Sequence, residues 1–219
     1  MSSTSPVQFA VVTADVVGSR QIDSFVEVRD RKLQVISDLH GANGLVQSPY
    51  AVTAWDEFQV IASAPERIPR ILFDLRRMFA PMELRIGVGM GSATGTGQFP
   101  INLYAGGPAF ERAREAANRL RVKSPKFRLL TSFESGNADF DIIANTVYRL
   151  QDALLEGITP RQWETINLQV DSTGLAQTAE RQDVDISTVS RSLSRAYYWH
   201  LVDTRDAMEQ VIKKHLQLV

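Results

Sequence analysis

Cysteine is absent from the 219 residues of the sequence, and histidine is scarce. Without cysteine the chain can form neither disulfide bonds nor thiolate metal sites, and this composition is compatible with a reducing compartment. The three histidines, His40, His200 and His215, are far apart in the sequence and lack the spacing of metal ligands. We therefore interpret all three as structural residues.

Long apolar runs are also missing. No run in the sequence reaches the roughly 18 residues that a membrane-spanning helix requires. The first six residues, Met1 to Pro6, lack the basic and apolar regions of a signal peptide. We expect a cytoplasmic protein that has no membrane partner.

An excess of charge of one sign is absent too, because 24 basic and 25 acidic residues leave a net charge of −1. This balance argues against nucleic-acid binding by the whole surface, but it is compatible with a local basic face. The hydrophobic content of 44% and the charged content of 22% are ordinary for a globular protein, and the length predicts one or two domains.

Two carboxylates interrupt apolar segments in the first third of the chain. Asp15 lies within the apolar run 9–17, and Asp56 precedes Glu57 at the entrance of an alternating segment that ends at Ile61. An exposed strand entrance is the simple interpretation of the Asp-Glu pair alone. However, neighbouring strands with one acid each can direct both towards a hard cation, and Mg²⁺ is typically held by one or two carboxylates together with phosphates. The sequence therefore predicts a metal and phosphate site at Asp15 and Asp56.

Apolar periodicity predicts strands and helices in the order β-α-β-β-α-β up to residue 88, which is the order of a ferredoxin-like split unit. The expected strands cover residues 7–12, 45–47, 52–62 and 84–88, and the expected helices cover residues 22–40 and 65–81. A charged helix over 107–120, a strand over 127–131 and a helix over 137–156 follow. The fold class is α+β, with a ferredoxin-like domain over residues 1–135 and an all-helical domain over 136–219. The boundary falls at 132–136, or after Gly157 if the preceding helix packs on the first domain.

Glycine is concentrated between residues 87 and 107, which hold seven of the thirteen glycines. Because glycine allows a close approach of the backbone to a ligand, a phosphate-binding loop is one interpretation. The segment has neither a P-loop Gly-Lys-Ser/Thr nor a helix directly after the three alternating glycines. Dense packing of a strand end beside a flexible hairpin is the simpler interpretation.

The last third of the chain predicts three consecutive helices. Thr159, Pro160 and Gln162 combine three signals of a helix start, and the helices are expected over 160–170, over 173–182 and from 185 to about 200. The spacing of the small and apolar residues Ala179, Val184 and Val189 is typical of a helix-turn-helix. Asp183 stands where glycine is usual in the turn.

The third of these helices separates a polar face from an apolar one. Val189 and Leu193 lie opposite two arginines, and residues 187–200 contain no acid. Hydroxyl and guanidinium groups suit contacts with phosphates, and arginine can recognise guanine in the major groove. The expected DNA-binding residues are Ser187, Thr188, Ser190, Arg191, Ser194 and Arg195. The alternative is a packing module whose serine-rich face meets solvent or another protein.

Four motifs occur in a recognisable order: ADVVGSR at 14–20, WDEF at 55–58, LRIGVGMGSATG at 84–95 and GGPAFERARE at 106–115. This order resembles the class III nucleotidyl cyclase and GGDEF superfamily, and the version followed by a helix-turn-helix resembles the SatD family over almost the whole chain. The resemblance implies that Asp15 and Asp56 bind metal ions and that a nucleotide is held nearby. The residues expected to hold the nucleotide are Gly18, Ser19, Arg20, Glu57, Gly91 and Arg114.

The chain departs from the cyclase pattern at positions that matter for catalysis. Trp55 stands in place of a glycine, and Val52 stands where many cyclases have a lysine that selects the base. Glu111 and Glu115 fall where an asparagine and an arginine would stabilise the transition state. We therefore expect little or no cyclase activity.

We expect a homodimeric transcriptional regulator that binds double-stranded DNA, with a degenerate cyclase-like domain as sensor or dimerisation platform. Its expected ligand is a nucleotide, with Mg²⁺ as the cofactor. Two alternatives remain: a Mg²⁺-dependent nucleotidyl cyclase or phosphohydrolase with a DNA-binding or interaction tail, and a purely structural dimerisation module.

Overall fold

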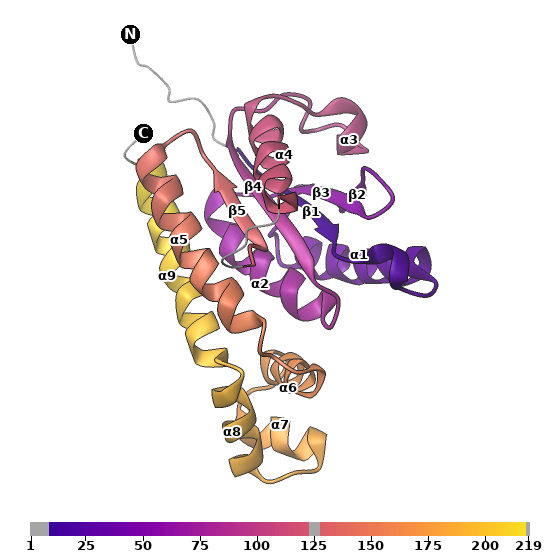
Figure 1. Ribbon diagram of the computed structural model, residues 1–219, viewed down its shortest axis with the longest axis vertical. Helices are drawn as coiled ribbons and strands as arrows, with labels where there is room; N and C mark the ends of the chain where they lie inside the picture. Colours follow the sequence, from indigo (N-terminus) through magenta and orange to yellow (C-terminus); the bar gives the residue numbers. More distant parts are fainter. Residues whose placement is uncertain (1–8, 123–127, 218–219) are drawn as a thin grey trace.

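The computed structural model describes residues 9–122 and 128–217 and shows a mixed α+β arrangement (Figure 1). Its five-stranded sheet has the order β2-β3-β1-β4-β5. The strands are β1 (Phe9–Val16), β2 (Ala51–Val52), β3 (Glu57–Ile61), β4 (Leu84–Gly91) and β5 (Thr131–Glu134). The pairs β2-β3, β3-β1 and β1-β4 are antiparallel, whereas β5 is parallel to β4.

Three expected strands differ from the structure. The long arm predicted over 52–62 is divided into β2 and β3, because the backbone N–H groups of Thr53 and Ala54 donate to Glu57 O and close a turn. The short arm over 45–47 is reduced to a bridge between Val46 and Ala62. The strand predicted over 127–131 overlaps β5 only at Thr131, and residue 127 lies outside the described residues, as do residues 7 and 8 of the first predicted strand.

The predicted helices are present, with one correction near the end of the chain. The α-helices are α1 (Phe25–Ala42), α2 (Ile68–Phe79), α3 (Ile101–Tyr104), α4 (Pro108–Arg121), α5 (Ala138–Leu155), α6 (Pro160–Val170), α7 (Leu175–Gln182), α8 (Ile186–Arg195) and α9 (Tyr198–Gln217). Short 3₁₀ helices cover Ser19–Gln21 and Pro65–Arg67. The helix expected from 185 to about 200 ends at Arg195, because Tyr197 has a φ of +54° and breaks the helical path before α9.

The two faces of the sheet are covered differently. Even-numbered residues of β1 belong to a core with α1, α2, α5 and α9, whereas Val11 belongs to a smaller cluster with α4. A Cβ atom on Gly87 would lie within 2.8 Å of the Cα of Ala117, and one on Gly89 within 2.8 Å of the Cα of Ala113. These two glycines allow α4 to lie directly on β4, so the packing interpretation is confirmed at these positions.

Helices α5 and α9 run side by side and connect the sheet with α6, α7 and α8 (Figure 1). Phe140 of α5 and Met208 of α9 lie in the core of the sheet, while Leu201 of α9 lies in a second apolar cluster with α6 and α8. Both clusters therefore include α9. The division of the chain at residue 135 stays a prediction.

Side chains of α5 bind the backbone of the segment that contains β5. The side chain of Asn145 accepts from Phe133 N at 2.8 Å and donates to Phe133 O at 3.0 Å. Asp152 accepts from the N–H groups of Leu130 and Thr131, each at 2.8 Å. At the opposite side of the sheet, Asn102 donates to Val52 O in β2 at 3.3 Å.

Across the ranges 9–122 and 128–217, none of the helices combines the length and the hydropathy needed to cross a lipid bilayer.

Candidate functional site

Asp15 lies on the face of the sheet that α4 covers, and its side chain is almost fully buried. Arg85, its cross-strand partner on β4, places Nε 3.0 Å from Asp15 Oδ1. Arg121, the last residue of α4, places Nε 3.4 Å from Asp15 Oδ2 and donates from Nη2 to Glu57 Oε2 at 2.9 Å. Both oxygens of the buried carboxylate therefore face guanidinium groups.

Asp56 lies beside Asp15 at the same corner of the sheet. The backbone N–H of Val16 donates to Asp56 O at 3.1 Å, and Ser19 Oγ donates to Asp56 Oδ2 at 2.8 Å. Thr53 Oγ1 donates to Glu57 Oε1 at 2.8 Å. The structure thus brings Asp15, Asp56 and Glu57 together, as the strand contexts of the two aspartates predicted.

The electrostatic balance at this corner is set by burial and by the two arginines. Burial raises the pKa of Asp15, and the neighbouring charge of Asp56 acts in the same direction. Arg85 and Arg121 oppose this effect, but the pKa of Asp15 remains above its ordinary value. Two guanidinium groups therefore compensate most of the charge of three carboxylates.

The arrangement around Asp15 does not fit a magnesium site as it stands. Mg²⁺ needs free carboxylate oxygens and several waters in octahedral geometry, whereas the oxygens of Asp15 already face Arg85 and Arg121. The described part of the chain contains no group of three or more His, Cys, Asp or Glu residues placed to hold a metal ion. The binding of Mg²⁺ together with a nucleotide stays a prediction.

The residues expected to hold a nucleotide are divided between two ends of the sheet. Gly18, with a φ of +69°, Ser19 and the exposed Arg20 lie next to Asp56. Gly91 pairs with Phe9 at the other end of β1, about 20 Å away at the rise of an antiparallel strand. The exposed Arg114 has no hydrogen bond or ion pair with any described residue. One nucleotide at the Asp15 corner would not contact this whole set.

Arg85 and Arg121 are not among the residues predicted from the sequence. The sequence contains a signal for Arg85. Successive side chains of a strand point to opposite faces, so Arg85 lies on the same face of β4 as Gly87. Since α4 follows β4 and packs back along it, the end of α4 returns to the beginning of β4, where Arg85 lies. Glu111 and Glu115 of α4 are exposed and do not contact Asp15.

The second candidate site is the polar face of α8. Val189 and Leu193 are fully buried on one side of the helix. On the other side, Ser190 is partly buried and the remaining predicted DNA-binding residues are exposed: Ser187, Thr188, Arg191, Ser194 and Arg195. Arg191 Nε donates to Ser187 O at 3.1 Å, while Arg195 makes no hydrogen bond or ion pair with the described residues.

The turn between α7 and α8 is tight although it lacks glycine. Asp183 ends α7 with φ 53° and ψ 51°, in the left-handed region that Asp adopts more readily than most residues. The next residue, Val184, donates its backbone N–H to Ala179 O at 3.1 Å, and Ala179 is buried. An aspartate thus provides the left-handed conformation for which glycine is usual in this turn.

The sequence model of the SatD family matches residues 9–194. The chain belongs to the SatD family. A search of curated proteins found no match. In this SatD-family chain the matched range contains the Asp15 corner, α6, α7 and all of α8 except Arg195.

Proposed function

We propose that this SatD-family protein binds double-stranded DNA through α8 and acts as a transcriptional regulator. The observation that carries the proposal is the division of α8 into a fully buried apolar side and an exposed side with two arginines and several hydroxyl groups. Arginine and hydroxyl side chains are the groups that contact phosphates and base edges in DNA complexes.

The arrangement of α6, α7 and α8 supports a helix-turn-helix assignment. The two helices joined by the turn at Asp183 pack on each other and on α6. In addition, α8 lies at the end of the molecule that is remote from the sheet (Figure 1), so the sheet does not cover its polar side. In a helix-turn-helix the second helix enters the major groove.

The sheet supports the ferredoxin-like assignment of the first part of the chain. Read from β4, the order β4-β1-β3-β2 with antiparallel neighbours is that of the split β-α-β-β-α-β unit, to which β5 is added. We propose that this cyclase-like part serves as a sensor or as an assembly platform. Because helix-turn-helix proteins usually read paired half-sites as dimers, we also propose a homodimer.

The proposal is tested by selecting DNA fragments with the full-length protein and titrating them at several salt concentrations. If Arg195 contacts guanine, Arg195→Ala should cost about 1–3 kcal/mol of binding free energy and relax specificity at one base. If it contacts a phosphate, binding to all sequences should weaken and the salt dependence should become shallower. Arg191→Ala is tested in the same way.

Arg31→Ala is the matched control, because Arg31 is an exposed arginine on α1, far from α8 (Figure 1). This variant should bind DNA like the unaltered protein. The proposal would be wrong if DNA binding were weak and unselective and if the α8 variants changed it no more than the control does. In that case α8 would be only a packing element.

A further inference from the structure

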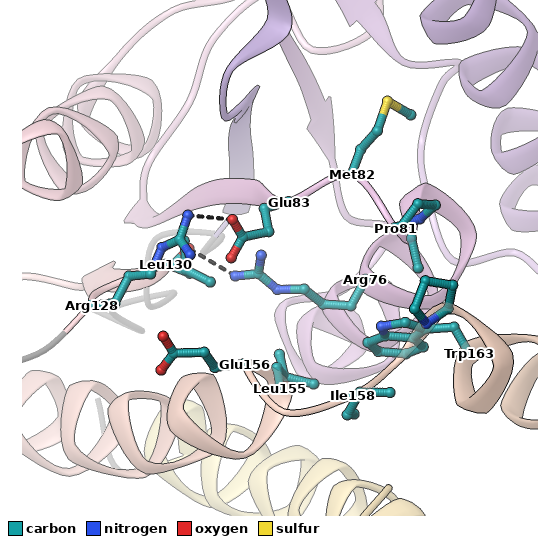
Figure 2. A pocket seen from close by; sticks show the side chains of 12 residues that line it. Arg76, Pro81, Met82, Glu83, Arg128, Leu130, Leu155, Glu156, Ile158 and Trp163 are labelled. Carbon is teal, nitrogen blue, oxygen red and sulfur yellow. Dashed lines mark hydrogen bonds and ion pairs between the residues drawn. The ribbon is translucent and has the colours of Figure 1, made fainter. Parts of the chain in front are cut away.

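A pocket of about 340 Å³ lies where the sheet meets the beginning of α6 (Figure 2). Its walls come from the end of α2, the segments just before β4 and β5, the end of α5 and the first turn of α6. This volume is at the small end of the range of ligand sites in proteins. The pocket is separate from both the Asp15 corner and the polar face of α8.

The pocket has an apolar side and a charged side. In Figure 2, Trp163, Pro81 and Ile158 lie towards one side, and Glu83, Arg128 and Glu156 lie towards the other. Trp163 and Ile158 are each 9% exposed, so their apolar surface is accessible only in part. A ligand that fits this pocket needs an apolar part and a polar part.

The charges on the polar side are of both signs, with two carboxylates and one guanidinium group. Glu83 and Arg128 form an ion pair in which 35% and 45% of the side chains remain exposed. Glu156 is exposed, and its side chain has no hydrogen bond or ion pair with the described residues. The pocket therefore offers an accessible guanidinium group and two accessible carboxylates.

Arg76 lines the pocket but adds little net charge to it. Its Nη2 donates to Leu130 O and to Thr131 Oγ1, each at 2.8 Å, and lies 3.5 Å from the buried carboxylate of Asp152. The positive charge of Arg76 is thus compensated inside the protein. A phosphate group in the pocket would face Glu83 and Glu156 with Arg128 as the main counter-charge, which disfavours a nucleotide.

We propose that this pocket binds a small zwitterion that carries a flat apolar group, of which an α-amino acid with an aromatic side chain is the simplest example. Its carboxylate would face Arg128, its ammonium group would face Glu156, whose carboxylate is not paired with Arg128, and its ring would lie against Trp163 and the neighbouring apolar residues. Aromatic groups gain both from the area that they bury and from ring contacts.

The pocket also lies against the core that supports α8. Trp163 and Ile158 belong to the same apolar cluster as Val189 and Leu193 of that helix. The binding site itself does not depend on whether α8 binds DNA.

The experiment uses the fluorescence of Trp163 in the full chain. The other two tryptophans, Trp55 and Trp199, are 58% and 48% exposed and are replaced by phenylalanine. Titration with L-phenylalanine should give a saturable change in the emission of Trp163. Phenethylamine lacks the carboxylate and 3-phenylpropanoic acid lacks the ammonium group, so each should bind about tenfold more weakly, the order of effect expected for one lost hydrogen bond between charged groups.

Variants of residues on the charged side of the pocket provide the second part of the test. Glu156→Gln and Arg128→Gln should each weaken the binding of L-phenylalanine about tenfold. Glu164→Gln and Arg161→Gln are the controls, because these residues form an exposed ion pair on α6 near Trp163. The controls should leave the affinity unchanged.

Three results would overturn the proposal: no saturable change in emission at millimolar L-phenylalanine, equal affinities for the amino acid and its two analogues, or equal effects of the pocket variants and the controls. Circular dichroism of every variant establishes that it is folded, so that a loss of binding is not a loss of structure.

Discussion

At the scale of single residues, Arg121 has the most informative position in the sheet part of the molecule. It joins Asp15, which is buried, to Glu57, which is partly exposed, and it does so from the last residue of α4. A guanidinium group thus lies where the resemblance to cyclases implies a metal ion. We expect the carboxylates to accept a metal ion more readily when this group is absent.

Arg121→Ala removes one of the two cations that face the carboxylates. We expect Mg²⁺ or Mn²⁺ to raise the melting temperature of this variant more than that of the unaltered protein, since an ion that binds only the folded state stabilises it by mass action. Differential scanning fluorimetry with increasing ion concentration measures the effect. Arg114→Ala, also on α4 but without partners among the described residues, is the control. An equal response of all three proteins would contradict the prediction.

Asp74 is a buried acid whose charge stabilises the fold. It accepts from Arg70 Nε at 2.8 Å and Arg77 Nε at 2.7 Å, and His40 Nε2 lies 3.4 Å away. Burial alone would raise the pKa of Asp74, but the nearby imidazole of His40 and the guanidinium groups of Arg77 and Arg70 together hold it well below its usual range. The carboxylate therefore remains ionised inside the protein.

Asp74→Asn should lower the free energy of unfolding by about 3–5 kcal/mol at neutral pH, because it leaves the buried guanidinium group of Arg77 without its counter-charge. The folded-state pKa lies below the unfolded-state pKa, so this stabilisation is present above about pH 4 and is lost as the pH falls further towards the folded-state pKa. Urea unfolding from pH 7 to pH 3 should show the difference shrinking. Asp203→Asn, at an exposed position on α9, should show no such difference. A constant difference across this pH range would refute the assignment.

At the scale of elements, the contact between α4 and β4 depends on glycines of β4, which have no side chain to hold the helix away. Gly89→Ala would place a Cβ atom against the backbone of α4, which cannot move as a flexible side chain can. We expect a loss of stability of about 1–3 kcal/mol or more, as in other overpacked cores. Gly97→Ala is the control, since a Cβ atom there would meet nothing within 4 Å. Thermal or urea denaturation compares the two, and equal stability would contradict the prediction.

Local sequence signals predict the helices and strands better than they predict the contacts between them. The start of α6 is confirmed in detail, because Thr159 and Gln162 form the reciprocal hydrogen bonds of a capping box. The turn at 53–56 is not predicted, because the apolar alternation continues through Val52 and Phe58 and predicts an unbroken strand over 52–62. Periodicity shows which face a residue occupies but not where a strand stops pairing.

The Asp15 corner could be predicted only in part for the same reason. Asp15 and Asp56 were recognised because each is an acid in an apolar segment. Arg85 and Arg121 were not, because arginine is common on exposed helical and strand positions and only the packing of α4 on β4 brings these two together. A pairing between residues 106 positions apart, such as Asp15 and Arg121, has no local signal.

At the scale of the whole molecule, the sheet and the helices α6 to α8 are joined by more than the chain. Arg77 of α2 and Asn167 of α6 exchange two hydrogen bonds, each at 3.2 Å. Phe73 of α2 lies in the apolar cluster of α6 and α8, and α9 contributes to both clusters. These contacts couple the two parts energetically.

We therefore expect one cooperative unfolding transition. Circular dichroism, which reports all helices, and fluorescence of Trp163 in the protein with Trp55 and Trp199 replaced by phenylalanine, which reports the beginning of α6, should give the same midpoint in urea. Two separate midpoints would show that the helical part unfolds independently. In the variant Asn167→Ala the two midpoints should begin to separate, whereas Asn118→Ala, at an exposed position on α4, should leave them together.

The bonds that α5 makes to β5 have a consequence for how copies of the protein can associate. The side-chain amide of Asn145 binds the backbone of Phe133 as a sixth strand would. The carboxylate of Asp152 accepts from the backbone N–H groups of Leu130 and Thr131. At the opposite edge, β2 has only two residues and Asn102 binds one of its carbonyl groups. Neither edge offers a row of free backbone groups, which is how soluble sheets avoid adding strands from other molecules. Two copies of this protein would therefore meet through helices and not by extending the sheet.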